Sequence, residues 1–175
     1  MAPSPLSLFH RLVGKADPRL ALRPLYDAIV AEGRQPHWYV DGGVPDTLDG
    51  RFDMIVALLS IVLLRLEQER AAQESAWLTE VFIDDMDGQL RQEGIGDVVV
   101  GKHIGKMMSA LGGRLSAYRD ALAPGGDLRG ALLRNLYRGE SPSDEARDHV
   151  EARLRARALR VGQCTRARLL AGDIG

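Results

Sequence analysis

The spacing of apolar residues constrains the fold most, because it is helical along nearly the whole chain. No segment alternates apolar and polar residues for more than a few positions, as a half-buried strand does. Within residues 50–73, apolar side chains cover much of a helix circumference; they are Phe52, Ile55, Val56, Leu59, Ile61, Val62, Leu63 and Leu66. A helix that is apolar on most sides has to be enclosed by other helices. The chain is therefore predicted to be an all-α, single-domain bundle around this helix.

Residues that favour helix starts and stops divide the pattern into about six helices. The predicted helices span residues 24–33, 50–73, 75–93, 99–122 and 128–139, with a last one after Ser141. Asp49, Asp127 and Ser141 are the predicted N-caps of three of them, because short polar side chains accept hydrogen bonds from free backbone amides. Residues 34–50 are predicted to form a loop, since they contain several prolines and glycines.

Length and composition restrict the classes of protein to which the chain can belong. A net charge of −1 over 175 residues argues against a dedicated nucleic-acid binder, which is usually basic. The single cysteine, Cys164, suits a reducing compartment. The longest apolar stretch has eleven residues, whereas a membrane-spanning helix needs about 20. We expect a mobile basic segment at residues 1–18 and a helical domain at residues 19–175. The protein is predicted to be cytoplasmic and peripheral at the inner face of the membrane.

The stretch from Val81 to His103 contains fragments of three site motifs, and none is complete. In "DDMDG", Gly88 directly follows Asp87 and no glutamate closes a calcium loop. "GDVVVGKH" ends in His103, where a phosphate-binding loop needs Ser or Thr, and no strand precedes it. The aspartates lie too close on one helix to face each other across a substrate. The histidines and Cys164 lack metal-binding spacing. We therefore expect no catalytic residue, no metal and no cofactor.

Asp85 is the acidic residue of this stretch that should turn inward. At 3.6 residues per turn it lies in the middle of an apolar stripe, whereas Asp84 and Asp87 point away from it. A buried carboxylate needs a cationic or hydrogen-bonding partner. We expect Asp85 to pair with a base of another helix, such as Arg51, Lys102 or Arg114. That pair would either lock helix packing or form a polar contact in a binding groove.

The helix predicted for residues 99–122 has two distinct strips. Its apolar seam consists of Ile104, Met108, Leu111, Leu115, Tyr118 and Leu122. Beside the seam runs a strip of small residues, which are Gly101, Gly105, Ser109, Gly112 and Ser116. Each interior glycine lowers helix stability by about 1 kcal/mol, so the small residues call for a reason. Either a neighbouring helix approaches closely, or a partner helix lies in a shallow channel floored by Met107 and Met108.

Two further features leave alternatives open. Trp38 and Tyr39 lie in the proline- and glycine-rich loop, where they either fold back on the core or anchor a partner. Residues 67–97 contain nine acidic residues and two arginines, whereas residues 147–168 contain seven arginines and two acidic residues. These opposed charges either pair within the bundle or attract partners.

Two segments resemble the ubiquinol–cytochrome c chaperone family. They are "GVPDTLDGRFDMIVALL" (residues 43–59) and "VFIDDMDGQLRQEGIGDVVVGKHIGKMMSALGGRLSAYRDAL" (residues 81–122). The resemblance covers residues 25–122, and the chain after Leu122 adds little to it. It implies a non-enzymatic chaperone, of a family with bacterial members, that assists assembly of the ubiquinol–cytochrome c reductase (bc1) complex. The implied client is newly made cytochrome b, with a small co-chaperone and the ribosome as further partners.

The resemblance and the patterns together give a set of candidate partner-binding residues. They are Trp38, Tyr39, Asp46, Arg51, Asp84, Asp85, Asp87, Lys102, Met107, Met108 and Arg114. The alternative is a helical module that binds protein, ribosome or nucleic acid through its arginine-rich C-terminal helix. For that alternative we expect charge reversal at Arg155 and Arg157 to abolish binding without unfolding the protein.

Overall fold

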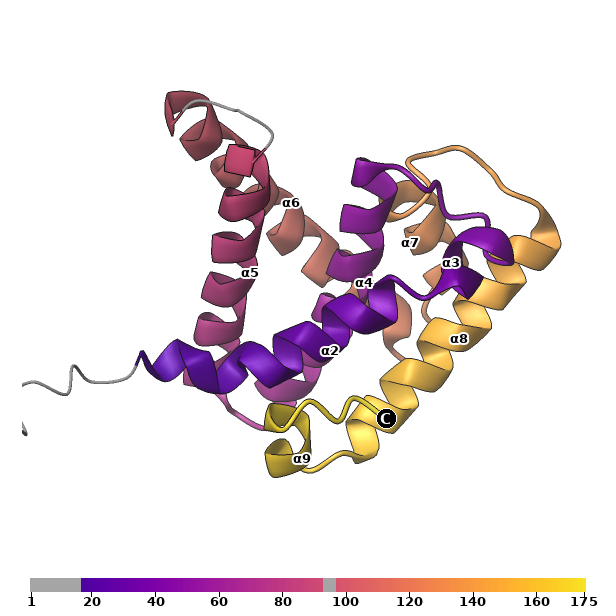
Figure 1. Ribbon diagram of the computed structural model, residues 1–175. Coiled ribbons are helices and arrows are strands. Elements are labelled where there is room, and N and C mark those ends of the chain that lie inside the picture. Colours follow the sequence, from indigo (N-terminus) through magenta and orange to yellow (C-terminus); the bar gives the residue numbers. More distant parts are fainter. Residues whose placement is uncertain (1–16, 93–96) are drawn as a thin grey trace, which may run out of the picture.

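The computed structural model describes residues 17–92 and 97–175, and every regular element in these ranges is a helix (Figure 1). A short 3-10 helix comes first, and eight α-helices follow it. These elements are η1 (Pro18–Leu22), α2 (Arg23–Gly33), α3 (Pro36–Val40), α4 (Leu48–Gln68), α5 (Ala72–Gln92), α6 (Asp97–Leu122), α7 (Leu128–Asn135), α8 (Asp144–Gln163) and α9 (Arg166–Leu170). The all-α class is confirmed, while the predicted number of helices was too low. Most of the segment predicted to be mobile, residues 1–18, lies outside the described residues.

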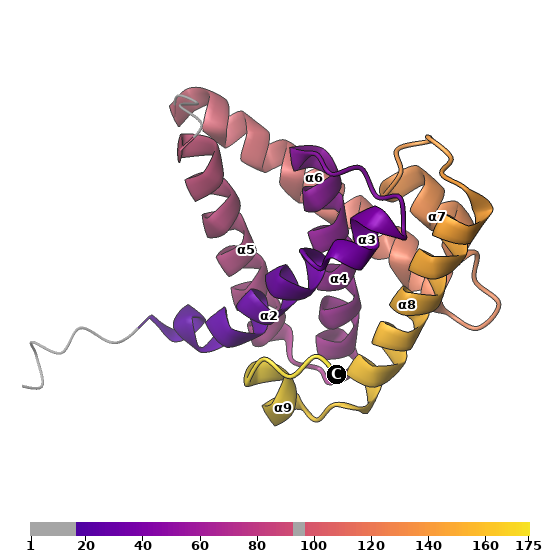
Figure 2. The same ribbon diagram turned by 45° about the vertical axis from the view of Figure 1, so that its right-hand side comes forward.

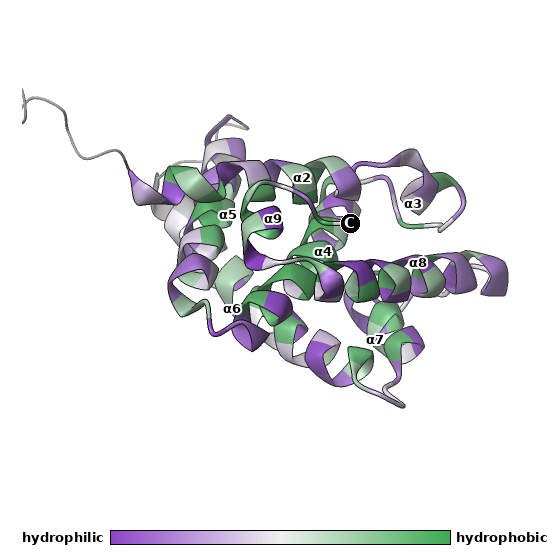
Figure 3. Cartoon of the chain, turned by 90° about the horizontal axis from the view of Figure 1, so that it is seen from below, coloured by the Kyte–Doolittle hydropathy of each residue, from purple (hydrophilic) through white to green (hydrophobic). Residues whose placement is uncertain are grey.

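Helix α4 is the centre of the bundle, as its apolar pattern predicts. Every residue from Asp53 to Leu63 is buried, and α2, α5, α6 and α8 all contact this helix. Figure 2 shows α5 and α6 diverging from their adjoining ends, with α4 and α2 between them and α8 on the far side. In Figure 3, α4 is mostly hydrophobic, whereas α8 mixes hydrophilic and hydrophobic residues along its length. The core therefore forms around α4, and α8 covers it with one side.

Two predicted caps were wrong by a few residues. Thr47, rather than Asp49, caps α4, because its extended backbone lets its hydroxyl accept from the Gly50 amide at 3.1 Å. In the same way Ser143, rather than Ser141, caps α8. The predicted cap of α7, Asp127, is confirmed, since its carboxylate accepts from the Gly130 amide.

The predicted loop at residues 34–50 contains the short helix α3, which begins at Pro36. Trp38 folds back into the core: it is 1% exposed, and its Nε1 donates to the Glu32 carbonyl at 2.9 Å. Tyr39 is half-buried, and its hydroxyl donates to the Gly33 carbonyl at 2.6 Å. The two neighbouring aromatics therefore have different environments, one in the core and one at its edge.

The basic segment forms ion pairs both with the acidic segment and with acids elsewhere in the bundle. Arg166, in the basic C-terminal part, forms an ion pair with Glu74 in the acidic part. Arg157 pairs with Glu32 of α2 at 2.7 Å, with both side chains largely buried. Arg155 pairs with Glu151 one turn before it.

Residues 17–92 and 97–175 contain no helix with the length and apolar content that crossing a membrane requires.

The strip of small residues on α6 faces outward. An added Cβ at Gly101, Gly105 or Gly112 would meet no atom within 4 Å. The interpretation that these glycines admit a closely packed helix of the same chain is therefore wrong. By helical geometry the strip lies on one flank of the apolar seam, and Met107 lies on the other.

This openness leads to a stability prediction. We expect Gly105→Ala and Gly112→Ala each to raise the free energy of unfolding by up to about 1 kcal/mol, because alanine loses less backbone entropy than glycine in a helix. The melting temperature should rise by about 2–4 °C for each substitution, which thermal unfolding followed by circular dichroism measures. Gly50→Ala is the control, because its Cβ would overlap the Pro45 carbonyl oxygen and the variant should melt earlier. Earlier melting of the two α6 variants would contradict the prediction.

Candidate functional site

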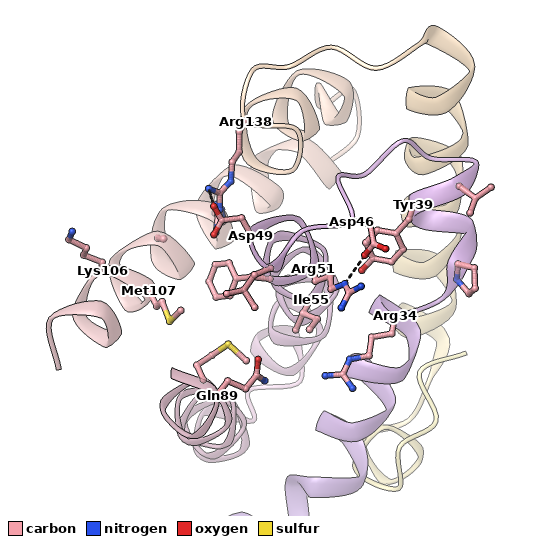
Figure 4. Close-up of a pocket in the computed structure, with 17 residues that line it drawn as sticks. Arg34, Tyr39, Asp46, Asp49, Arg51, Ile55, Gln89, Lys106, Met107 and Arg138 are labelled. Atoms are coloured by element: carbon pink, nitrogen blue, oxygen red, sulfur yellow. Dashed lines mark hydrogen bonds and ion pairs between the residues drawn. The ribbon is translucent and has the colours of Figure 1, made fainter. Parts of the chain in front are cut away.

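A cavity of about 810 Å³ opens at the first turns of α4. The end of α2 and helix α3 border it on one side, and α5 and α6 border it on the other (Figure 4). We call this cavity, together with its lining residues from Arg34 to Arg138, the α4 groove. The start of α4 forms part of its lining, together with residues of α3, α5 and α6.

The floor of the α4 groove is apolar. Phe52 and Ile55 come from α4 at a spacing of three, Met86 comes from α5, and Met107 with Ala110 comes from α6. Two further apolar side chains form an exposed lip: Val40 is 79% exposed and Leu48 is 57% exposed. The floor and the lip together offer apolar side chains to a partner.

The rim of the α4 groove carries more positive than negative charge. Its cations are Arg34, Arg51, Lys106, Arg114 and Arg138, and its acids are Asp46 and Asp49. Arg51 Nε lies 2.7 Å from Asp46, and this contact lowers the pKa of the Asp46 carboxyl. Arg34 and Lys106 form no ion pair with the residues that the structure describes.

A buried carboxylate holds two of the rim arginines. Asp53 of α4 is 0% exposed, and Arg114 and Arg138 each approach it to 2.6 Å. Arg138 also contacts Asp49 at 2.6 Å, and its backbone is left-handed with a φ of 54°. That conformation is uncommon for a residue with a side chain. Burial raises the pKa of Asp53, and the two guanidinium groups oppose this rise.

Residues from four helices, α3, α4, α5 and α6, and from three connections thus give the groove an apolar floor and a cationic rim. A family model for ubiquinol-cytochrome C chaperones matches residues 40–174. The chain belongs to the ubiquinol–cytochrome c chaperone family. The match begins later than the resemblance noted above, at residue 40, and it continues through α7, α8 and α9. The C-terminal helices are therefore part of what the family shares.

A solved structure supports the same conclusion. The crystal structure of the Cbp3 homolog from Brucella abortus superimposes with a TM-score of 0.77 and 30% sequence identity. The similarity covers 97% of this chain and 94% of that chain. A search of the curated proteins found no match. This chain is thus a non-enzymatic assembly factor for the bc1 complex.

The lining of the α4 groove contains five of the eleven candidate partner-binding residues. They are Tyr39, Asp46, Arg51, Met107 and Arg114. The other six lie elsewhere: Trp38 is in the core, and Asp84, Asp85, Asp87, Lys102 and Met108 are outside the groove lining. Whether any of these residues contacts a partner stays a prediction.

The outward position of two aspartates agrees with the helical geometry. Asp84 is exposed and accepts from Arg19 of η1 at 2.8 Å. Asp87 accepts from Arg91 one turn later at 2.7 Å. Both aspartates therefore contribute to the surface of α5, on the side away from the core.

Asp85 turns inward, as predicted, but its predicted partner was wrong. The Tyr26 hydroxyl of α2 donates to Asp85 at 2.8 Å, and Gln89 Nε2 donates to it at 2.9 Å. Burial and the hydrogen bond to Asp85 raise the pKa of the Tyr26 hydroxyl. Hydrogen bonds to neutral groups satisfy the half-buried carboxylate, while Arg114 serves the more deeply buried Asp53. Asp85 therefore locks α5 to α2 without a base.

Asp53 was missed by the sequence analysis, although a signal existed. It lies within the apolar stripe of residues 50–73, where a lone carboxylate needs a partner as Asp85 does. Its partners come from residues 114 and 138, and nothing in the local pattern identifies them. The same search of each helix for an inward acid would have found it.

No group of three or more possible metal ligands occurs within residues 17–92 and 97–175. Two histidines do meet: His37 Nδ1 lies 3.0 Å from His149 Nε2, which joins α3 to α8. Burial lowers the pKa of His37, as does the neighbouring His149. This pair contributes to packing, since two nitrogen ligands alone do not complete a zinc site.

Proposed function

We propose that this chaperone binds newly made cytochrome b in the α4 groove during biogenesis of the bc1 complex. The observation that carries the proposal is the apolar floor of the groove, with its exposed lip at Val40 and Leu48. Newly made membrane subunits expose apolar helices before they are inserted and assembled. An open apolar groove matches such a helix better than it matches a small polar ligand.

The side chains on the floor suit a client whose sequence varies along its length. Met86 and Met107 are unbranched and polarisable, so they adapt to differently shaped apolar side chains. Phe52 supplies a rigid aromatic face on the same floor, and the centroid of its ring lies 5.5 Å from the guanidinium carbon of Arg114. Adaptable contacts on a fixed frame are what transient holding of a long apolar chain requires.

The proposal includes a place of action at the inner face of the cytoplasmic membrane, where the client is inserted. Contact with a small co-chaperone and with the ribosome is part of the same proposal. It rests on the family resemblance, and no residue of the described structure is assigned to these two partners.

Site-specific photo-crosslinking in cells tests the proposal. A photoreactive residue at Met107 should crosslink to cytochrome b, whereas one at the exposed Ala152 of α8 should not. Trp38 is unsuitable because it is buried. Mass spectrometry of the crosslinked product identifies the client. The proposal fails if Met107 yields only abundant soluble proteins and bc1 levels stay normal after deletion of the chaperone.

The alternative, binding of ribosome or nucleic acid through the arginine-rich C-terminal helix, has less support. Arg157 and Arg155, which this alternative requires, already form the ion pairs described above. Arg157 is also too deeply buried to serve as a surface contact.

A further inference from the structure

We infer that the α4 groove selects client segments in which a carboxylate flanks an apolar helical face, and that Arg34 binds this carboxylate. The inference rests on the proposed function, because it names the chemistry of the client that the groove would hold. Its observations are separate, however: they concern the charge of the rim and not the apolar floor.

Arg34 is placed to receive a negative group. It directly follows α2, it is exposed, and it forms no ion pair with the described residues. In Figure 4 its guanidinium points across the groove toward Gln89 of α5. A guanidinium binds a carboxylate through two parallel hydrogen bonds, which fixes the orientation of the bound group.

The other lining cations are less available. Arg51 is engaged by Asp46, and Arg114 and Arg138 are engaged by Asp53. Lys106 forms no ion pair with the described residues, but its ammonium group points away from the groove in Figure 4. Among the described residues that line the groove, Arg34 therefore combines an inward direction with an unneutralised charge.

The acids of the rim give the groove a direction. Asp46 lies just before α4 and Asp49 lies in its first turn, and in Figure 4 both are drawn above Arg34 and Gln89. Asp46 and Asp49 are paired with Arg51 and Arg138, so their side of the groove is close to neutral, whereas the unpaired Arg34 attracts a client carboxylate to its own side. The client segment should therefore bind with its acidic residue beside Arg34 and its apolar residues over Phe52 and Met107.

The same acids favour a protein segment over a lipid surface. Asp46 and Asp49 are 60% and 69% exposed, and they pair with Arg51 and Arg138, so the mouth of the groove lacks the cluster of free cations that an anionic bilayer attracts. Arg34 points into the groove and only Lys106, of the two unpaired lining cations, points away from it, whereas binding to an anionic lipid surface calls for a cluster of outward cations. A cavity of about 810 Å³ accommodates the apolar anchors that one helix face presents at intervals of three and four residues.

Matched peptides test the inference with the full-length protein. The probes are three labelled 18-residue amphipathic peptides with one Leu/Met face and a single Glu, Gln or Lys beside it. We expect the Glu peptide to bind about tenfold more tightly than the Gln peptide, because an ion-paired hydrogen bond is stronger than a neutral one. The Lys peptide should bind most weakly. Fluorescence anisotropy gives each Kd, and the preference for Glu should shrink in high salt.

Three variants assign the preference to its residue. Arg34→Gln should abolish the preference for Glu, while Arg160→Gln, which removes the same charge from exposed α8, should retain it. Met107→Ser should raise the Kd of all three peptides by a similar factor, since it removes an apolar contact. Circular dichroism confirms that each variant is folded.

The outcomes separate this inference from the proposed function. Equal binding of the Glu and Gln peptides, or no binding of any peptide, overturns the inference. Crosslinking of cytochrome b to Met107 would leave the proposed function intact in either case. Arg34-dependent binding of phosphatidylglycerol vesicles without a preference among the peptides would make the groove a lipid site, which also overturns the inference.

Discussion

Replacing Asp53 with alanine should destabilise the protein by about 3–5 kcal/mol, because it leaves a buried cation without its counter-charge. Asp53 is fully buried, and it is the ion-pair partner of Arg114, whose side chain is only 14% exposed. The same carboxylate holds Arg138, which keeps a left-handed backbone conformation. Urea unfolding followed by circular dichroism measures the loss, and the folded variant should also bind clients less well because the groove wall loosens.

Asp49→Asn is the matched control. Asp49 contacts the same arginine, Arg138, but its side chain is 69% exposed. Exposed ion pairs contribute about 0–1 kcal/mol, so the free energy of unfolding of this variant should lie within about 1 kcal/mol of that of the natural chain. If Asp53→Ala behaves like Asp49→Asn, the buried network does not hold the groove together.

The contrast between Asp53 and Asp85 shows what helical periodicity can predict. Periodicity identifies an inward-facing acid, because position on a helix is a local property. It does not identify the partner, which depends on how helices pack. Asp85 accepts a hydrogen bond from Tyr26, whereas Asp53 forms ion pairs with two arginines, although both carboxylates lie in similar apolar stripes. The all-α class and the central helix were therefore predictable, whereas the ion-pair network was not.

The α4 groove shows the same division. Its lining residues span positions 34 to 138, so no single pattern in the sequence contains it. The sequence analysis selected Met107 and Arg114, but it placed Met107 in a channel beside the small residues of α6. The groove lies on the other flank of that helix. Tyr39 was selected together with Trp38, and the short helix α3, which the sequence analysis missed, directs the two rings to different places.

Reversing the charge of Arg157 should unfold the protein, with a loss of about 3–5 kcal/mol. Arg157 is 11% exposed and pairs with Glu32 at 2.7 Å, which fastens α8 to α2. Its guanidinium also donates to the Ile174 carbonyl at 3.2 Å. Arg157→Glu would place two carboxylates together in a largely buried site and would leave that carbonyl without its donor. Urea unfolding measures the loss, and the exposed Arg160→Glu should change stability by less than about 0.5 kcal/mol.

The charge-swapped double variant shows whether the pair itself is responsible. Combining Arg157→Glu with Glu32→Arg restores opposite charges, so it should recover part of the stability that Arg157→Glu loses. Recovery should be incomplete, since a glutamate cannot donate to the Ile174 carbonyl. A swap that recovers nothing would indicate that packing, and not charge, joins the two helices. If Arg157→Glu instead remains as stable as the natural chain but stops binding ribosomes or RNA, the arginine-rich helix is a binding surface, and the alternative function replaces the groove as the better explanation.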